Sequence, residues 1–142
     1  MDSAAEEVRL VVPSTIQSLA LINSVTEEVS GQMGFDEEAR DAITISVIEA
    51  GTNAIQHGNR EDSSKPTEVL FRKEKDRLTV LIRDHGGGFD PGNLKDPLAK
   101  ENLFAASGRG IYILRSFMDE VDFRFPDNDG GTECLLVKYL PR

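Results

Sequence analysis

The pattern of apolar residues in the first third of the chain changes from that of a β-strand to that of an α-helix. Residues 8–12 are largely apolar and Pro13 ends the run, so a short strand is predicted there. After it, apolar side chains recur every three or four positions, the period of an amphipathic helix. Ser14 is the expected N-cap of this helix and Gly31 its expected end. Its apolar positions are Ile16, Leu19, Ile22, Val25 and Val29.

A second helix is predicted to follow, with Asp36 as its N-cap. The Glu of a complete capping box is replaced here by Ala39. The helical period continues to about His57, and Gly58 then ends it. Residues 59–66 hold turn-forming side chains without a period, which predicts a loop.

The rest of the chain shows strand-like alternation, interrupted by one more helix. Residues 69–71 and 78–82 alternate between apolar and polar, and the short charged link 74–76 predicts an antiparallel hairpin. A third helix is expected after Gly110, with apolar positions at Ile111, Leu114, Phe117 and Met118. Two last strands are expected, joined as a hairpin by the turn 127–131. The side chains expected to point inward are Val121, Phe123 and Phe125 in the first strand, and Leu135, Val137 and Tyr139 in the second.

The predicted order of elements is therefore β-α-α-β-β-α-β-β. Hairpins make the sheet mixed but mostly antiparallel, and helices packed on one face of it give an α+β two-layer sandwich. The chain has 142 residues, enough for one domain with a sizeable core, so residues 1–142 are expected to form a single domain.

Composition and charge narrow the classes of function. Hydrophobic content of 39% and charged content of 29% are ordinary for a soluble protein, and no run approaches the ~18 apolar residues of a membrane span. The net charge of −9 argues against nucleic acid as the main partner, because phosphate binding needs clustered Lys and Arg. The N-terminus has no apolar signal segment, and the single Cys134, expected to be a buried thiol, forms no internal disulfide. These features favour the cytoplasm.

The first of three candidate chemical elements is a polar stripe on the second helix. Glu49, Asn53 and His57 are spaced four residues apart, so on an α-helix they share one face amid apolar neighbours. A carboxylate in such a place suits general-base catalysis, and a carboxamide oxygen is a hard neutral ligand for Mg²⁺. The alternative is a partly solvated stripe on a surface helix.

The second element, Asp84-x-Gly86-x-Gly88, lies at the end of a predicted strand. A buried carboxylate there is able to accept a hydrogen bond from the exocyclic amine of adenine. The glycines allow the backbone to approach a planar base without a Cβ clash. The alternative is a plain Asp-Gly turn between two elements.

The third element, Ser107-Gly108-Arg109-Gly110, opens the third helix. Free N–H groups at a helix N-terminus attract phosphate, and Arg109 adds a positive charge. The alternative is a glycine-rich loop with an exposed Arg. The sequence lacks a P-loop, the motifs of eukaryotic-type kinases and the ligand spacing of a zinc site.

Taken in order, the three elements resemble the GHKL ATPase superfamily, and most closely its small anti-sigma-factor serine kinases of bacterial partner-switching systems. The resemblance covers about residues 8–140. Residues 49–58 resemble the N box, residues 84–90 the first glycine box, and residues 107–111 the second glycine box. The segment Met118-Asp119-Glu120-Val121 is a further subfamily marker.

The resemblance implies the Bergerat fold, with ATP between the helices and the sheet. It places Asn53 on Mg²⁺, Asp84 on the adenine amine and Gly88 against the base. Thr132, at the start of the last strand, would share a water with that Asp. A lid would span about residues 91–107, and residues 108–110 would contact phosphates.

The implied function is an ATP-dependent protein serine/threonine kinase. Glu49 would activate a hydroxyl of a STAS-domain anti-anti-sigma protein, and Arg109 would offset charge on the transferred phosphoryl group. The same protein would sequester a sigma factor or another regulator, and the family suggests a homodimer. Gly51, unusual inside a helix at a cost of about 1 kcal/mol relative to Ala, would be explained by close approach of the nucleotide.

Two other functions fit less of the sequence. A nucleotide-dependent binding module with little kinase activity has no need of a base such as Glu49. A free-standing ATPase of the chaperone or repair type carries extra domains, for which 142 residues leave no room.

Overall fold

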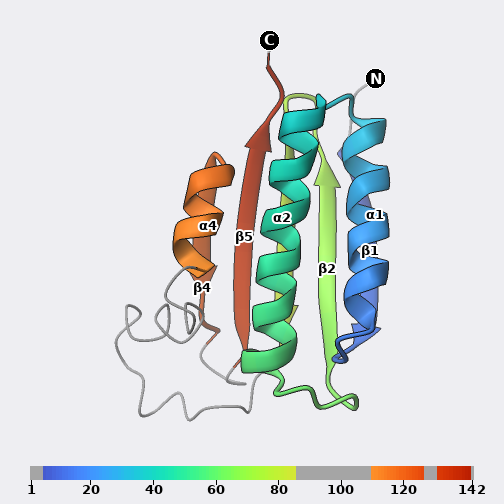
Figure 1. The fold of residues 1–142 in the computed structure, drawn as a ribbon, viewed down its shortest axis with the longest axis vertical. Helices are drawn as coiled ribbons and strands as arrows, with labels where there is room; N and C mark the ends of the chain where they lie inside the picture. The colour runs from blue at the N-terminus through green and yellow to red at the C-terminus, as the bar shows by residue number, and fades with distance from the viewer. Residues whose placement is uncertain (1–4, 86–109, 127–130, 142) are drawn as a thin grey trace.

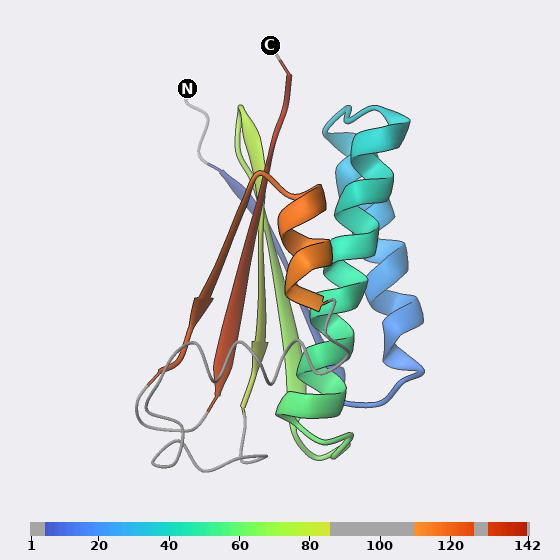
Figure 2. The same cartoon turned by 60° about the vertical axis from the view of Figure 1, so that its left-hand side comes forward.

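A sheet and a layer of helices make up the described part of the chain. The computed structural model describes residues 5–85, 110–126 and 131–141. The sheet has the strand order β1-β2-β3-β5-β4, and α1, α2 and α4 lie on one of its faces (Figures 1 and 2). In chain order the elements are β1 (Glu6–Pro13), α1 (Ser18–Gln32), α2 (Glu37–Asn53), the π-helical turn η1 (Ala54–Gly58), β2 (Pro66–Lys73), β3 (Arg77–Asp84), α4 (Gly110–Phe117), β4 (Glu120–Arg124) and β5 (Thr132–Tyr139).

The predicted order of elements and the α+β two-layer fold are confirmed. The hairpins also form as predicted, β2 with β3 and β4 with β5. One detail of the prediction is wrong, because every pairing among the described strands is antiparallel and the sheet is not mixed. None of the described helices is long and apolar enough to cross a membrane.

The core lies between the sheet and the helices. Alternate residues of β2 and β3 are buried, as the strand pattern predicted. Burial of each large apolar side chain contributes roughly 1.5–3 kcal/mol. Side chains with no exposed surface include Ile22, Ile43, Val47, Ile55, Val69, Phe71, Leu78, Val80 and Leu136.

The side of β5 that faces the helices differs from the predicted side. Leu136 is fully buried and Cys134 is 3% exposed, and both belong to the core cluster, whereas Tyr139 is 37% exposed. Val137 is buried as predicted, at 4% exposed, but alternation places it on the other face of the strand. The helix-facing residues are therefore Cys134 and Leu136 rather than Leu135, Val137 and Tyr139. The cause is the register with β3, where Leu136 lies opposite Val80 and Cys134 opposite Ile82. A shift of one residue turns every side chain of a strand to the other face. Burial raises the pKa of the Cys134 thiol, which therefore stays protonated and inert.

The start of the first helix also differs from the prediction. Helix α1 begins at Ser18, and its N-cap Gln17 makes no side-chain capping bond. Ser14 is not the cap, because its hydroxyl is buried and donates to the Lys65 carbonyl at 2.6 Å. It ties the end of β1 to the segment that enters β2.

Between α1 and α2, the predicted N-cap is confirmed, but the glycine predicted to end α1 is the wrong one. Gly31 lies inside α1, and the residue in the left-handed conformation is Gly34, with φ +84°. Asp36 caps α2 as predicted, since its Oδ1 accepts from Ala39 N at 2.9 Å. Asp36 therefore satisfies one of the free N–H groups of the first turn.

Candidate functional site

One end of the sandwich is where α2 and β3 end and β5 begins. The C-terminal ends of α2 and β3 lie there, together with the first residues of β5 (Figures 1 and 2). Asp84 closes β3 and Thr132 opens β5, and the two residues are paired across the strands. The candidate residues described below all come from this end.

Asp84 is a buried carboxylate on the helix-facing side of the sheet. It continues the series Leu78, Val80 and Ile82 at every second position of β3, and it is only 2% exposed. The helix layer approaches it at Gly58. A Cβ at Gly58 would lie 2.8 Å from Asp84 Oδ1 and closer still to Cγ and Oδ2. Only glycine fits there, so Gly58 does more than end the helix.

Thr132 places a hydroxyl beside Asp84 on the same face of the sheet. Its side chain is 1% exposed, and Oγ1 has no hydrogen-bond partner within the described ranges. A buried hydroxyl of this kind fits a water or a ligand atom as its partner. The position of Thr132 follows from the same register that places Cys134 and Leu136 on the helix-facing side of β5. If Leu135, Val137 and Tyr139 faced the helices, Thr132 would point away from them.

Glu49 and Asn53 lie together on the last turns of α2, as the four-residue spacing predicted. Asn53 is 4% exposed and its Nδ2 donates to Glu49 Oε2 at 3.4 Å. This bond turns the Asn53 carbonyl oxygen away from the carboxylate, which leaves a hard oxygen donor for a cation. The Glu49 carboxylate is half-buried and has a defined orientation.

His57 does not belong to this pair. The helix changes from α to π geometry at Ala54, and His57 lies in the wider turn with its side chain exposed. The i to i+4 rule holds only for α-helical geometry, so the predicted three-residue stripe ends at Asn53. Such π-turns occur often at functional sites.

Gly51 has a different role from the one expected. A Cβ at this position would meet Leu19 Cδ2 at 3.5 Å and Ile22 Cδ1 at 3.6 Å. Gly51 therefore faces α1 within the core, and approach of a nucleotide does not explain it.

Several predicted site residues lie outside the described residues. These are Gly86, Gly88, Ser107, Gly108 and Arg109, together with the proposed lid 91–107. Gly110 is described, and it is the buried first residue of α4.

Asn59 is a buried polar residue that the sequence analysis missed. It is 1% exposed, and its carboxamide joins the end of η1 to the residue after β1, to β2 and to the residue after β3. In the sequence it stands among turn-forming residues, where an Asn carries no sign of burial.

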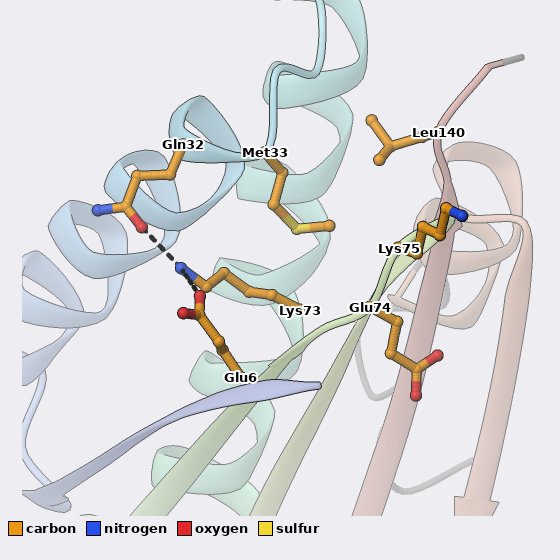
Figure 3. Close-up of a pocket in the computed structure, with 7 residues that line it drawn as sticks. All are labelled: Glu6, Gln32, Met33, Lys73, Glu74, Lys75 and Leu140. Carbon is orange, nitrogen blue, oxygen red and sulfur yellow. Dashed lines mark hydrogen bonds and ion pairs between the residues drawn. The ribbon is translucent and has the colours of Figure 1, made fainter. Parts of the chain in front are cut away.

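An open hollow lies at the opposite end of the sandwich (Figure 3). Lys73 donates to Gln32 Oε1 at 2.8 Å and forms an ion pair with Glu6 at 3.1 Å. None of the predicted site residues that the structure describes lines this hollow. Its lining consists of Glu6, Gln32, Met33, Lys73, Glu74, Lys75 and Leu140.

No group of three or more His, Cys, Asp or Glu side chains within the described ranges is arranged to hold a metal ion.

Comparison with known proteins agrees with the arrangement of these residues. Residues 12–138 match the family described as "Histidine kinase-like ATPase domain". The serine-protein kinase RsbW of Bacillus cereus is 28% identical over 143 residues, which cover 96% of this chain and 87% of that protein. The serine-protein kinase RsbW of Bacillus subtilis is 28% identical over 146 residues, covering 99% and 89% of the two chains.

A solved structure supports the fold itself. The crystal structure of the RsbU and RsbW domains of Rv1364c from Mycobacterium tuberculosis matches with a TM-score of 0.68 at 16% identity, over 96% of this chain and 33% of that one. The resemblance predicted from the three sequence boxes is thus confirmed. The chain belongs to the histidine kinase-like ATPase domain family of the GHKL superfamily, and it is similar to the RsbW serine-protein kinases.

Proposed function

We propose that the protein is an ATP-dependent serine/threonine kinase that phosphorylates a STAS-domain anti-anti-sigma protein and sequesters a sigma factor or another regulator. One observation carries the proposal. The Asp84–Thr132 pair and the Glu49–Asn53 pair come from different elements and occupy the same end of the fold. The names of the relatives support the same class of reaction.

The Asp84 region fits an adenine base. Its carboxylate is buried on the helix-facing side of the sheet, and Thr132 offers a buried hydroxyl that lacks a partner among the described residues. A carboxylate accepts hydrogen bonds, so it selects a base that presents an amine. Gly58 removes the side chain that would otherwise fill the space of this carboxylate.

Asn53 is the proposed protein ligand of Mg²⁺. Its Nδ2 is directed to Glu49, so its carbonyl oxygen is the atom suited to the cation. When bound, Mg²⁺ offsets the negative charge of the ATP phosphates.

Glu49 is the proposed general base. The bond from Asn53 holds its carboxylate, and only part of its surface is exposed, so an incoming hydroxyl is able to reach it. The carboxylate takes the proton of the serine or threonine hydroxyl, which increases the nucleophilicity of that oxygen.

The remaining assignments stay predictions from the sequence. Gly86 and Gly88 would contact the base, while Ser107, Gly108 and Gly110 would contact the phosphates. Arg109 would stabilise the transferring phosphoryl group. Four further assignments are also predictions from the sequence: the lid 91–107, the single domain 1–142, the homodimer and the cytoplasmic location.

Phosphotransfer to STAS-domain proteins encoded by neighbouring genes tests the proposal. With labelled ATP, Glu49→Gln is expected to reduce transfer by about 10²–10⁴-fold, because the base is lost, while ATP affinity measured by calorimetry stays near that of the wild type. Asn53→Ala is expected to weaken both ATP binding with Mg²⁺ and transfer.

The outcomes separate the alternatives. Transfer by Glu49→Gln at the wild-type rate would exclude Glu49 as the base. ATP-dependent capture of the STAS protein by the wild type without any transfer would instead identify a binding module. Rapid hydrolysis without a protein partner would identify a free-standing ATPase.

A further inference from the structure

The carboxamide of Asn59 connects four separate parts of the chain. Its Nδ2 donates to Ser14 Oγ at 2.9 Å and to the Pro66 carbonyl at 3.0 Å. Its Oδ1 accepts from the backbone N–H of His85 at 3.1 Å. Both the amide nitrogen and the carbonyl oxygen of this 1% exposed side chain are thus engaged, by the residue after β1, by β2 and by the residue after β3.

The surrounding bonds set the direction of this network. Ser14 has one hydroxyl hydrogen, and it goes to the Lys65 carbonyl. Thr67 Oγ1 lies 2.7 Å from Ser14 Oγ and must therefore be the donor in that contact. Ser14 Oγ then accepts from both Thr67 and Asn59, which fixes Asn59 Nδ2 toward Ser14 and Oδ1 toward His85.

The bond to His85 lies immediately beside the tightest contact of the site. Gly58 precedes Asn59 in the chain, and Asp84 precedes His85. Gly58 and the Asp84 carboxylate are in close contact, and the residues that follow them, Asn59 and His85, are joined by a hydrogen bond. This bond therefore holds the two segments together next to the site. On its other side, Asn59 is anchored to the residue after β1 and to β2, so the link is fixed relative to the sheet.

The backbone around Asn59 is also unusual. Arg60 and Glu61, the next two residues, have φ values of 54° and 57°, a left-handed conformation uncommon for residues other than glycine. The turn is closed by Asn59 N to the Ala54 carbonyl at 2.8 Å and by Glu61 N to the Ile55 carbonyl at 2.7 Å. Strained backbone of this kind persists only where its surroundings determine it, and it gathers at functional sites.

We propose that Asn59 is a positioning residue for base recognition. Its carboxamide holds the end of β3 against η1, and this sets the place of the Asp84 carboxylate that receives the adenine amine. The inference rests on the proposed function. It goes beyond it by assigning nucleobase selectivity to a residue that does not contact the nucleotide.

Base selectivity separates positioning from a merely structural role. ATP carries the exocyclic amine, and inosine triphosphate (ITP) carries a carbonyl oxygen in its place. Wild-type protein is expected to bind ATP more tightly than ITP by calorimetry. Asn59→Ala is expected to lower ATP affinity by about tenfold or more, the value of a hydrogen bond to a charged group, and ITP affinity by less than about threefold.

Ser14→Ala is the matched control. Ser14 belongs to the same buried network but has no bond to His85, and without its hydroxyl Asn59 Nδ2 keeps the bond to the Pro66 carbonyl that holds Oδ1 toward His85. It is expected to lower the melting temperature while leaving the ratio of ATP to ITP affinity unchanged. An equal loss of ATP and ITP affinity in Asn59→Ala, or a changed ratio in Ser14→Ala, would overturn the proposal.

A measurement on the wild type covers the case in which Asn59→Ala does not fold. Hydrogen exchange at the His85 amide reports the Asn59–His85 bond directly. Saturating ATP is expected to slow this exchange more than saturating ITP, because the adenine-bound state requires the bond. Equal protection by both nucleotides would contradict the positioning role. Absence of any ATP binding by the wild type would instead refute the proposed function itself.

Discussion

The two ends of the sandwich treat polar groups in opposite ways. At the end that holds the candidate site, four polar side chains are each at most 4% exposed: Asn53, Asn59, Asp84 and Thr132. At the other end, the hollow in Figure 3 is lined by charges that remain near water, and the Glu6 side chain paired with Lys73 is 77% exposed. Both ends are polar, but the candidate site residues are buried more deeply than the ion pair of the hollow, whose Lys73 side chain is 17% exposed.

The difference lies in what each arrangement costs. A surface ion pair contributes about 0–1 kcal/mol and is solvated whether or not it forms. A buried polar group costs free energy unless a partner satisfies it. The hollow is therefore explained by ordinary surface chemistry, whereas the buried cluster requires a ligand or a dedicated network. Burial of polar groups, rather than a depression in the surface, marks the site.

The largest effect on ATP affinity is expected from filling the space beside Asp84. Gly58→Ala brings a Cβ into collision with the carboxylate, and relief of such overpacking costs roughly 1–3 kcal/mol. ATP affinity is expected to fall roughly tenfold to hundredfold by calorimetry. Gly51→Ala, in the same helical segment, meets only ordinary contacts at 3.5 and 3.6 Å.

Gly51→Ala is therefore the control for the Gly58 variant. It is expected to keep ATP affinity and to raise the free energy of unfolding by up to about 1 kcal/mol through helix propensity. If Gly58→Ala bound ATP as the wild type does, the buried cluster would not be the base site.

A smaller effect is expected at Thr132. Thr132→Val keeps the shape of the side chain and removes a hydroxyl that has no partner among the described residues, so the protein should be as stable or slightly more stable. ATP affinity is expected to fall by about threefold to tenfold, because a bond made only with nucleotide or its water is lost.

Ser46 supplies the control for this variant. Its hydroxyl is also buried without a partner among the described residues, but it lies earlier on α2 than Asn53. Ser46→Ala should leave ATP affinity unchanged in the same titration. Equal effects of the two variants would show that loss of a buried hydroxyl, not its place, is what matters.

The smallest effect is expected at the opposite end. Lys73→Met removes the bond to Gln32 and the ion pair with Glu6 but keeps the aliphatic chain. Denaturant unfolding should show a change below about 1 kcal/mol, and ATP affinity should stay within about twofold of the wild type. A tenfold loss of ATP affinity would show that the two ends are not independent.

Local pattern was enough to predict most of the fold. The order of elements follows from the period of the apolar residues, and the Asp36 cap is confirmed. The Glu49–Asn53 pair needed only the pitch of an α-helix. The errors fall where local pattern is ambiguous: the face of β5, the cap assigned to Ser14, the helix end assigned to Gly31, and His57 in the π-turn.

By itself, then, the sequence determined the elements, the family and the residues that belong to its three boxes, because these depend on neighbours a few positions apart. The family resemblance implied that Thr132 lies near Asp84, but only the tertiary structure gave the strand pairing between them. Only the tertiary structure decided that Gly58 must lack a side chain and that Asn59 reaches Ser14 and His85. These contacts join residues 26 to 48 positions apart (58 to 84, 59 to 14, 59 to 85, 84 to 132). They exist because strand register and helix packing bring distant backbone together, and no local period encodes that register.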